Sequence, residues 1–241
     1  MTRTPLQRQR TAAWRVWQAD VATRPGGDWA DLGGVAVHTT GIPVRHWNGA
    51  HLTHAEGLQH VDEVDAWFAA RAMPWGLLVP TELGLTPRGL EQVTVQRVML
   101  RDLDDLPAVT GPALRWDAGE DAAVVQAAAF GDGLEQTLGF VGPKLLNAAC
   151  GVVTGYDGSR PVSTATVVVV DGVAAVFGVA TLPSYQRRGW GRALTLAVLH
   201  EGARRGADLA YLNPSDSGEP VYRALGFTDA PGLAVWAPRE P

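Results

Sequence analysis

One stretch of this chain, residues 176–194, constrains the fold more than any other. Its sequence predicts a buried strand, then a loop that contains Gly189 and Gly191, and directly after the loop a helix. The first N–H groups of a helix have no partner within it, and the helix dipole places partial positive charge at the same end. The glycines allow the backbone to approach a ligand closely, and three arginines around them add positive charge. The stretch therefore predicts a site for the pyrophosphate of a nucleotide-containing cofactor.

The loop motif narrows the choice of cofactor. Neither the dinucleotide fingerprint G-x-G-x-x-G nor the P-loop pattern G-x-x-x-x-G-K-[ST] occurs in it. The sequence QRRGWG at 186–191 instead resembles the [Q/R]-x-x-G-x-[G/A] loop of the GNAT superfamily, the acyl-CoA-dependent N-acyltransferases. Downstream, YRALGF at 222–227 resembles the Y-x-x-x-G-F segment of that family, and a short apolar run at 209–212 lies between the two. The resemblance covers roughly residues 113–236, about half of the chain.

The resemblance implies an α/β fold, with a mixed, mostly antiparallel central sheet flanked by helices. The residues themselves predict helices at 122–130 and, in broken form, at 134–145. Three strands are expected at 148–156, 162–170 and 173–181. Asp171-Gly172 is a strong signal for a two-residue hairpin between the last two strands.

The first half of the chain shows a weaker form of the same order, which predicts two related halves. We expect a hairpin of residues 35–39 and 44–47, a helix at 61–71, an apolar run at 75–79 and a strand at 93–98. No QRRGWG-like loop stands before this helix, so residues 1–110 are interpreted as a degenerate GNAT-like half that covers the acceptor side. A polar linker is expected at 101–112, and residues 111–241 are expected to form the catalytic domain that binds acetyl-CoA.

The resemblance also assigns roles to single residues. The strand before the loop would pair its backbone with the pantetheine, and the Val179 N–H would polarise the thioester oxygen. Asn213 would contact the cofactor or an ordered water, and Tyr222 falls on the position of the general acid. The residues expected to bind acetyl-CoA are Val179, Thr181, Gln186, Arg187, Arg188, Gly189, Trp190, Gly191, Arg192 and Asn213.

Two of these assignments have structural alternatives. A phenol of pKa about 10 can protonate a departing thiolate of pKa about 8.5 when the two are aligned. The alternative for Tyr222 is that its ring packs in the helix–sheet core ahead of Gly226 and Phe227. Asn213 stands before Pro214, and an Asn-Pro pair also favours a turn.

The general base is missing from the expected place. An alkylamine of pKa about 10.4 is mostly protonated at neutral pH, so a group or a water must take its proton. Many relatives carry a glutamate on the strand before the loop, but residues 173–181 contain no acid. Substitutes to consider are Asp132, Glu135, His38 and His46. If none serves, the enzyme binds amines of low pKa or uses a chain of waters.

Composition bounds the remaining classes. A net charge of −5 argues against nonspecific binding of nucleic acid. No apolar run approaches the roughly 18–20 residues that span a bilayer, and no secretory signal is evident. The single cysteine, Cys150, excludes an intramolecular disulfide and fits the cytoplasm. His46, His51 and His54 lack the cysteines or carboxylates that a zinc site would need, so no metal is expected.

These observations predict an N-acetyltransferase that moves an acetyl group from acetyl-CoA to a small-molecule primary amine by direct attack. Acetylation of a protein amine is the second prediction for the acceptor. A non-catalytic acyl-CoA sensor and a purely structural protein are the alternatives from other classes. A monomer or a homodimer is expected.

Overall fold

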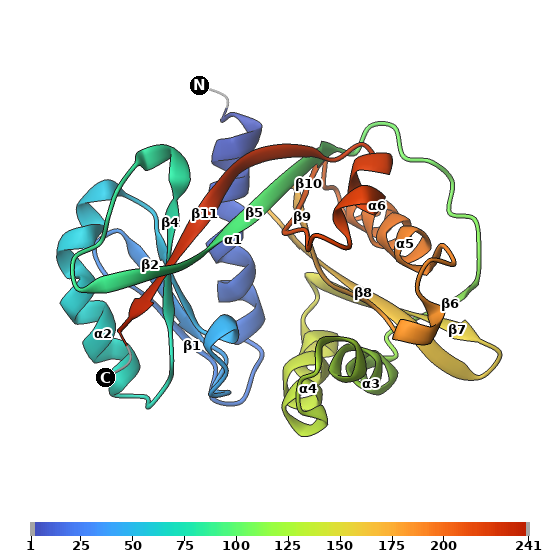
Figure 1. Cartoon of the computed structure of the whole chain (residues 1–241), viewed down its shortest axis with the longest axis horizontal. Coiled ribbons are helices and arrows are strands. Elements are labelled where there is room, and N and C mark those ends of the chain that lie inside the picture. The colour runs from blue at the N-terminus through green and yellow to red at the C-terminus, as the bar shows by residue number, and fades with distance from the viewer. Residues whose placement is uncertain (1–2, 240–241) are drawn as a thin grey trace. The chain divides into compact units, whose positions relative to one another are not determined.

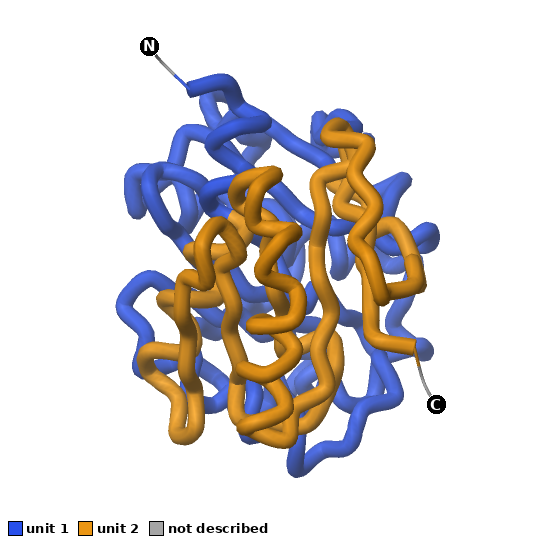
Figure 2. The backbone as a smooth tube through the Cα atoms, turned by 90° about the vertical axis from the view of Figure 1, so that its left-hand side faces the viewer, with its two compact units in different colours: residues 1–12, 99–229 blue, residues 13–98, 230–241 orange. Residues whose placement is uncertain are grey.

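The computed structural model describes residues 3–239, which belong to two compact units (Figure 2). Unit 1 comprises residues 1–12 and 99–229, and unit 2 comprises residues 13–98 and 230–241. Each unit is therefore discontinuous in sequence, whereas the sequence predicted a single division after residue 110. In both units a mixed, mostly antiparallel set of strands is flanked by helices (Figure 1), which confirms the expected fold class.

The strands of unit 1 lie in the order β6-β7-β8-β9-β10-β5, and only β9 and β10 run parallel to each other. The hairpin between β8 and β9 turns at Asp171 and Gly172, as predicted. Both residues have positive φ angles, 51° and 73°, which a two-residue hairpin turn of this type requires. The strands are β6 (Ala113–Trp116), β7 (Cys150–Asp157), β8 (Arg160–Val170), β9 (Val173–Thr181), β10 (Leu209–Leu212) and β5 (Leu90–Asp102), of which residues 99–102 pair with β10.

Helices cover both faces of these strands (Figure 1). On one face lie α3 (Gly119–Phe130) and α4 (Leu134–Val141), and a 3₁₀ turn at Gly142–Leu146 follows, which matches the broken helix expected there. On the other face lie α5 (Trp190–Arg204) and α6 (Glu219–Ala224).

The hydrophobic core of unit 1 lies between α5 and the strands. Leu194, Leu196 and Leu199 of α5 are fully buried, and they belong to one cluster with Val167 of β8 and Val176 of β9. Each such side chain contributes about 1.5–3 kcal/mol when it leaves water. This packing fixes α5 on the sheet and therefore fixes the position of its first turn.

Unit 2 contains the strand order β1-β2-β3-β4-β11. The residues at 44–47, expected to be a strand, instead form a 3₁₀ helix at Arg45–Trp47. The Asn48 side chain explains this difference, because it donates to the carbonyls of Ile42 and Val44 at 2.8 and 2.9 Å and so holds the segment in a turn. The elements of unit 2 are β1 (Asp28–Asp31), β2 (Val35–Thr39), β3 (Gly49–Leu52), α2 (Val61–Ala69), β4 (Gly76–Pro80), β11 (Thr228–Pro238) and part of α1 (Pro5–Val21).

The two units repeat one topology. In unit 2 the antiparallel pair β2–β3 is followed by α2 and by β4, which runs parallel to β3. In unit 1 the antiparallel pair β8–β9 is followed by α5 and by β10, which runs parallel to β9. In each unit one further strand, which comes from the other half of the chain, then pairs with the last strand of this series. In unit 2 β11 pairs with β4, and in unit 1 the end of β5 pairs with β10. The predicted order is thus present twice, and the loss of cofactor binding by the first copy stays a prediction.

Two buried histidines characterise the core of unit 2. His38 stacks on Trp17 with ring centroids 4.6 Å apart, and His51 lies 5.5 Å from His38. The His51 Nε2 is enclosed and has no hydrogen-bond partner among residues 3–239. Burial lowers the pKa of His51 to about 4, and burial together with the neighbouring His51 lowers the pKa of His38 well below its usual value. Both rings are therefore neutral in the folded protein at neutral pH.

This pair should make the protein sensitive to acid. Because the folded-state pKa values lie below the unfolded ones, the unfolded chain binds more protons between about pH 6.5 and pH 4, and the free energy of unfolding falls as the pH drops through that window. Between pH 7.5 and pH 5, the free energy of unfolding measured with urea should fall by about 2 kcal/mol less in the His51→Leu variant than in the wild type. Substitution of the exposed His54 by Leu is the control. An unchanged decline in His51→Leu would contradict the expectation.

Candidate functional site

The edge of β9 opens just before the glycine loop. The parallel pairing of β9 with β10 ends at Val176 and Leu212, but β9 continues to Thr181. The Leu182 N–H donates to the Val162 carbonyl on the β8 side at 2.9 Å. Because backbone groups alternate in direction along a strand, those of Thr181 point to the opposite, open edge. Thr181 and Val179, the two residues expected to pair with a pantetheine, both lie where β10 no longer reaches.

A β-bulge lies at the point where the two strands separate. Thr164 of β8 pairs with Ala180 and Thr166 pairs with Phe177, so that Gly178 and Val179 together face one residue of β8. Gly178 has a φ of 56°, which a residue with a side chain rarely adopts. Bulges bend a strand and change the direction of its groups. This one bends β9 next to its open edge.

The glycine loop leads directly into α5. Arg187 and Gly189 both have positive φ angles, 61° and 84°, and Gly189 caps the helix without a side-chain hydrogen bond. The first N–H that bonds within this turn is that of Ala193, which donates to the Gly189 carbonyl at 3.0 Å. Among the described residues, no backbone N–H from 187 to 192 has an acceptor. Six consecutive donors are therefore available to an anion at the positive end of the helix dipole.

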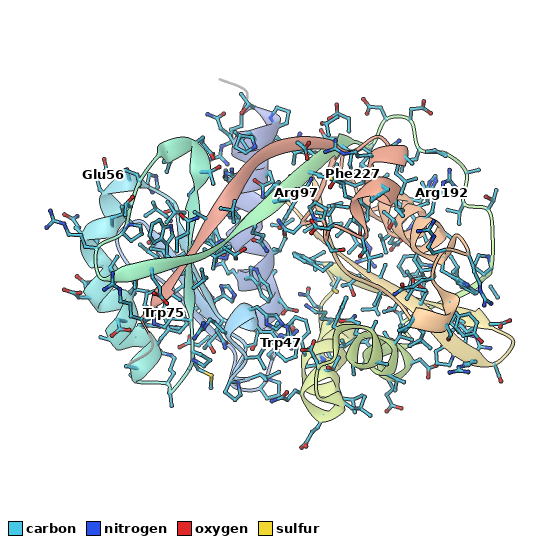
Figure 3. The ribbon with its side chains drawn as sticks, in the orientation of Figure 1. Trp47, Glu56, Trp75, Arg97, Arg192 and Phe227 are labelled. Atoms are coloured by element: carbon cyan, nitrogen blue, oxygen red, sulfur yellow. The ribbon has the colours of Figure 1, made fainter. Side chains whose placement is uncertain are left out.

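The surroundings of this turn are positive and sterically open. Within residues 3–239, none of Arg187, Arg188 and Arg192 forms an ion pair, although Arg188 lies 5.2 Å over the ring of Tyr185 (Arg192 is labelled in Figure 3). A Cβ added at Gly189 or Gly191 would meet no atom within 4 Å. An anion of pyrophosphate size fits these features, since it would neutralise the arginines and use the free donors.

Two loop side chains contact other parts of unit 1. The Gln186 Nε2 donates to the Thr181 carbonyl at 3.3 Å, which ties the loop to the end of β9. The half-buried Trp190 packs its ring on Gly155 of β7, where an added Cβ would stand 2.9 Å from the Trp190 Cζ3. These contacts help to position the loop, and the expected cofactor binding by Gln186 and Trp190 stays a prediction.

Adding a methyl group at Gly155 should therefore disturb the loop through Trp190. We expect the Gly155→Ala variant to lose about 1–3 kcal/mol of stability from overpacking and to bind acetyl-CoA roughly tenfold more weakly. Thermal unfolding and calorimetric titration check the two effects. Gly142→Ala is the control, because its Cβ would meet no atom and its φ of −53° suits alanine. A drop in melting temperature with unchanged affinity would limit Trp190 to a core role.

Tyr222 lies in α6, and its surroundings are compatible with both a packing role for its ring and a donor role for its hydroxyl. Its ring is 8% exposed, belongs to the core cluster that also contacts Val179, and meets Phe227 edge to face at 6.0 Å (Phe227 is labelled in Figure 3). Its hydroxyl makes no hydrogen bond within the described part of the chain. Burial raises the pKa of Tyr222 to about 12, so the phenol stays protonated at neutral pH. The ring is packed, and the hydroxyl is left as an available donor.

The remaining candidates come from elements other than β9 and the glycine loop. Asn213 follows β10 directly and is half-buried. Asp132 lies in the loop between α3 and α4, and Glu135 lies in the first turn of α4, so neither is on β9. His38 and His46 belong to unit 2. The described residues contain no group of three or more His, Cys, Asp or Glu side chains suited to hold a metal ion.

One residue at the site was missed by sequence reasoning. Gln126 of α3 is 6% exposed and lies against Gly178, the bulge residue of β9. The available signal was a single amide within the apolar run AAVVQAAAF at 122–130. A polar residue on the buried face of a helix usually has a specific partner.

Comparison with known sequences identifies a family. The sequence profile described as "Probable histone acetyltransferase Rv0428c C-terminal" matches residues 11–231 of this chain. No curated protein sequence gave a significant match.

Solved structures show the same fold. A GCN5-related N-acetyltransferase from Kribbella flavida superposes with a TM-score of 0.73 at 22% identity, covering 95% of this chain and 96% of that one. A GNAT-family protein from Novosphingobium aromaticivorans gives a TM-score of 0.66 at 16% identity, with coverages of 99% and 100%. A tandem GNAT protein from the clavulanic acid biosynthesis pathway gives 0.59 at 15%, with 90% and 86%. At these identities the likeness establishes the fold. No helix in the described residues is long and apolar enough to cross a membrane.

Proposed function

Because this chain belongs to the family described as "Probable histone acetyltransferase Rv0428c C-terminal", within the GNAT superfamily, we propose that unit 1 transfers an acetyl group from acetyl-CoA to a primary amine by direct attack. The observation that carries the proposal is the junction of β9 and α5. There an open strand edge at Val179 and Thr181 continues into six free N–H donors and three unpaired arginines.

These residues divide the binding of acetyl-CoA among them. The N–H groups of 187–192 and the side chains of Arg187 and Arg192 would hold the pyrophosphate. The backbone of Thr181 and Val179 would pair with the pantetheine amides, as an added strand does at a sheet edge. The Val179 N–H, which belongs to the bulge of β9, would donate to the thioester oxygen, where a fixed donor stabilises developing negative charge. Acetyl-CoA supplies the activated acetyl thioester.

The transfer balances with two proton movements. The neutral amine nitrogen forms a bond to the thioester carbon, and the carbon–sulfur bond breaks. The amine gives up one proton to water, and the departing thiolate takes one from the Tyr222 hydroxyl. A buried phenol with a pKa of about 12 retains that proton over the whole physiological range. Tyr222 would therefore serve as the general acid by donating its hydroxyl proton to the sulfur as the carbon–sulfur bond breaks, and water would return a proton to the phenolate, which is a stronger base than the thiolate.

For the acceptor we propose a small-molecule primary amine. A protein amine is the second candidate, because the family description names a histone acetyltransferase. Neither β8 nor β9, the strands beneath α3, carries an acidic residue that would favour a cationic peptide. The sequence also has no long acidic run for such a peptide to bind.

The direct test is release of free thiol from acetyl-CoA in the presence of two sets of acceptors. One set contains small primary amines that range in pKa from about 7 to 10, and the other contains lysine-rich histone-tail peptides. Turnover with the first set and not the second supports the proposal. Turnover with peptides alone would move the acceptor to the protein class. Tight binding of acetyl-CoA without turnover in either set would favour a sensor module.

A further inference from the structure

Gln126 stands out among the buried polar residues of unit 1. It lies in the middle of α3 on the face that packs against β8 and β9, and its neighbours Val125 and Ala127 are buried and apolar. Only 6% of the residue is exposed. A glutamine loses side-chain freedom and hydration when it is buried in this way, so its retention requires a reason.

Its carboxamide lies flat against the bulge of β9. A Cβ built on Gly178 would stand 2.8 Å from the Gln126 Nε2, 3.0 Å from its Cδ and 3.2 Å from its Oε1. A side chain at this position would require the Gln126 carboxamide to shift. The φ of 56° separately favours glycine here. The adjacent Val179 is the residue whose N–H is proposed above as the donor to the thioester oxygen.

The amide has no protein partner at this place. Within residues 3–239 neither its oxygen nor its nitrogen forms a hydrogen bond. Neither atom is among the fully enclosed side-chain atoms that lack a partner, so both reach accessible space. An unpaired amide that opens beside the bulge is available to a molecule that binds there, and buried polar groups are almost always satisfied by something.

We propose that Gln126 binds the acceptor amine beside the bulge, its Oε1 accepting a hydrogen bond from the amine nitrogen. This inference rests on the function proposed above. The bond would direct the nitrogen lone pair toward the thioester carbon, whose oxygen would accept a hydrogen bond from the Val179 N–H. In this way the amide from α3 occupies the place left by the missing acid on β9.

This assignment specifies the substrate class. A carboxamide cannot take a proton, and β8 and β9 contain no acid or histidine that could do so. On α3 the nearest acid toward the N-terminus, Asp121, already accepts the hydroxyl of Tyr156. The amine must therefore arrive neutral and release its proton to water after attack. Primary amines of low pKa should be the better substrates at neutral pH, and kcat/KM should rise with pH up to the pKa of the amine itself.

The test compares Gln126→Ala and Gln126→Glu with the wild-type protein, using the best small amine of the thiol-release screen. We expect Gln126→Ala to lower kcat/KM for the amine by roughly 10–100-fold while the Kd for acetyl-CoA stays within about twofold. In Gln126→Glu a carboxylate stands at the same place and acts as a base, so the rising limb of kcat/KM should move to lower pH for the same amine. The exposed Gln136→Ala on α4 is the control and should behave as wild type.

The outcomes separate the two proposals. If Gln126→Ala keeps kcat/KM within twofold, the assignment is wrong. If Gln126→Ala weakens acetyl-CoA binding and also lowers the melting temperature and kcat/KM, and if Gln126→Glu leaves the pH profile unchanged, Gln126 has a packing role only. Failure of the proposed function would instead appear as absence of thiol release by the wild-type protein with every amine, and it would overturn this assignment as well.

Discussion

The Tyr222→Phe variant should lose between about 10²- and 10⁴-fold in kcat, the usual contribution of a positioned general acid, while its Kd for acetyl-CoA changes less than about twofold. The loss is expected because the phenol is the proton donor for the leaving thiolate. Stability should change little, since the hydroxyl has no hydrogen-bond partner in the described part of the chain and the ring keeps its contact with Phe227. Steady-state thiol release, calorimetric titration and thermal unfolding measure the three quantities.

The pH profile gives an independent check of this role. Activity requires the protonated phenol, and that form is lost only as the pH rises through the folded-state pKa of about 12. The wild-type kcat should therefore show no descending alkaline limb below about pH 11, whereas an unperturbed tyrosine would give one near pH 10. A kcat for Tyr222→Phe within threefold of wild type would leave Tyr222 as a packing residue.

The Gly191→Asp variant should bind acetyl-CoA at least about 100-fold more weakly than the wild type. Gly191 is the second residue of α5, and the new carboxylate would project into open space beside the free donors. There it would compete for the N–H groups and repel the pyrophosphate by about 1–4 kcal/mol per charge pair at 4 Å. Titration of acetyl-CoA into the variant measures the loss.

Two controls distinguish this loss from damage to the fold. An acidic residue in the first turn of a helix is favourable by about 0.3–1 kcal/mol, so Gly191→Asp should keep or raise the melting temperature while it loses the ligand. Gly191→Ala fits the loop motif and should keep its affinity within about fivefold. Equal affinities in wild type and Gly191→Asp would place the cofactor elsewhere.

Local signals in the sequence were sufficient for the region around the site. The strand, the loop and the start and end of α5 follow from apolar patterning, two glycines and Gly206, whose φ of 88° ends the helix. The Asp171-Gly172 hairpin follows from turn chemistry. These features depend on residues close together in the chain, and such features can be predicted from sequence.

Features that depend on long-range pairing could not be predicted. The expected linker began at Arg101, but β5 continues to Asp102 because its last residues pair with β10 more than a hundred residues later. Likewise β11 completes the strand order that begins with β1. The pattern of apolar residues in a strand predicts which side chains are buried, but it does not predict which other strand pairs with it.

The contact of Gln126 with Gly178 belongs to the same class. It exists because the β8–β9 register shifts between Thr164 and Thr166. Gly178 within the strand pattern is a signal for that bulge, but it does not show which residue of another element lies against it. The sequence showed a missing acid on this strand but not which neighbouring element replaces it with a polar group.

A crystal structure of the protein with bound acetyl-CoA tests the central claim most directly. We predict pyrophosphate oxygens about 2.7–3.2 Å from several N–H groups of residues 187–192, and the thioester oxygen at similar distance from the Val179 nitrogen. The sulfur should lie within reach of the Tyr222 hydroxyl. Acetyl-CoA bound away from β9, or with its pyrophosphate in contact with none of these donors, would contradict the account.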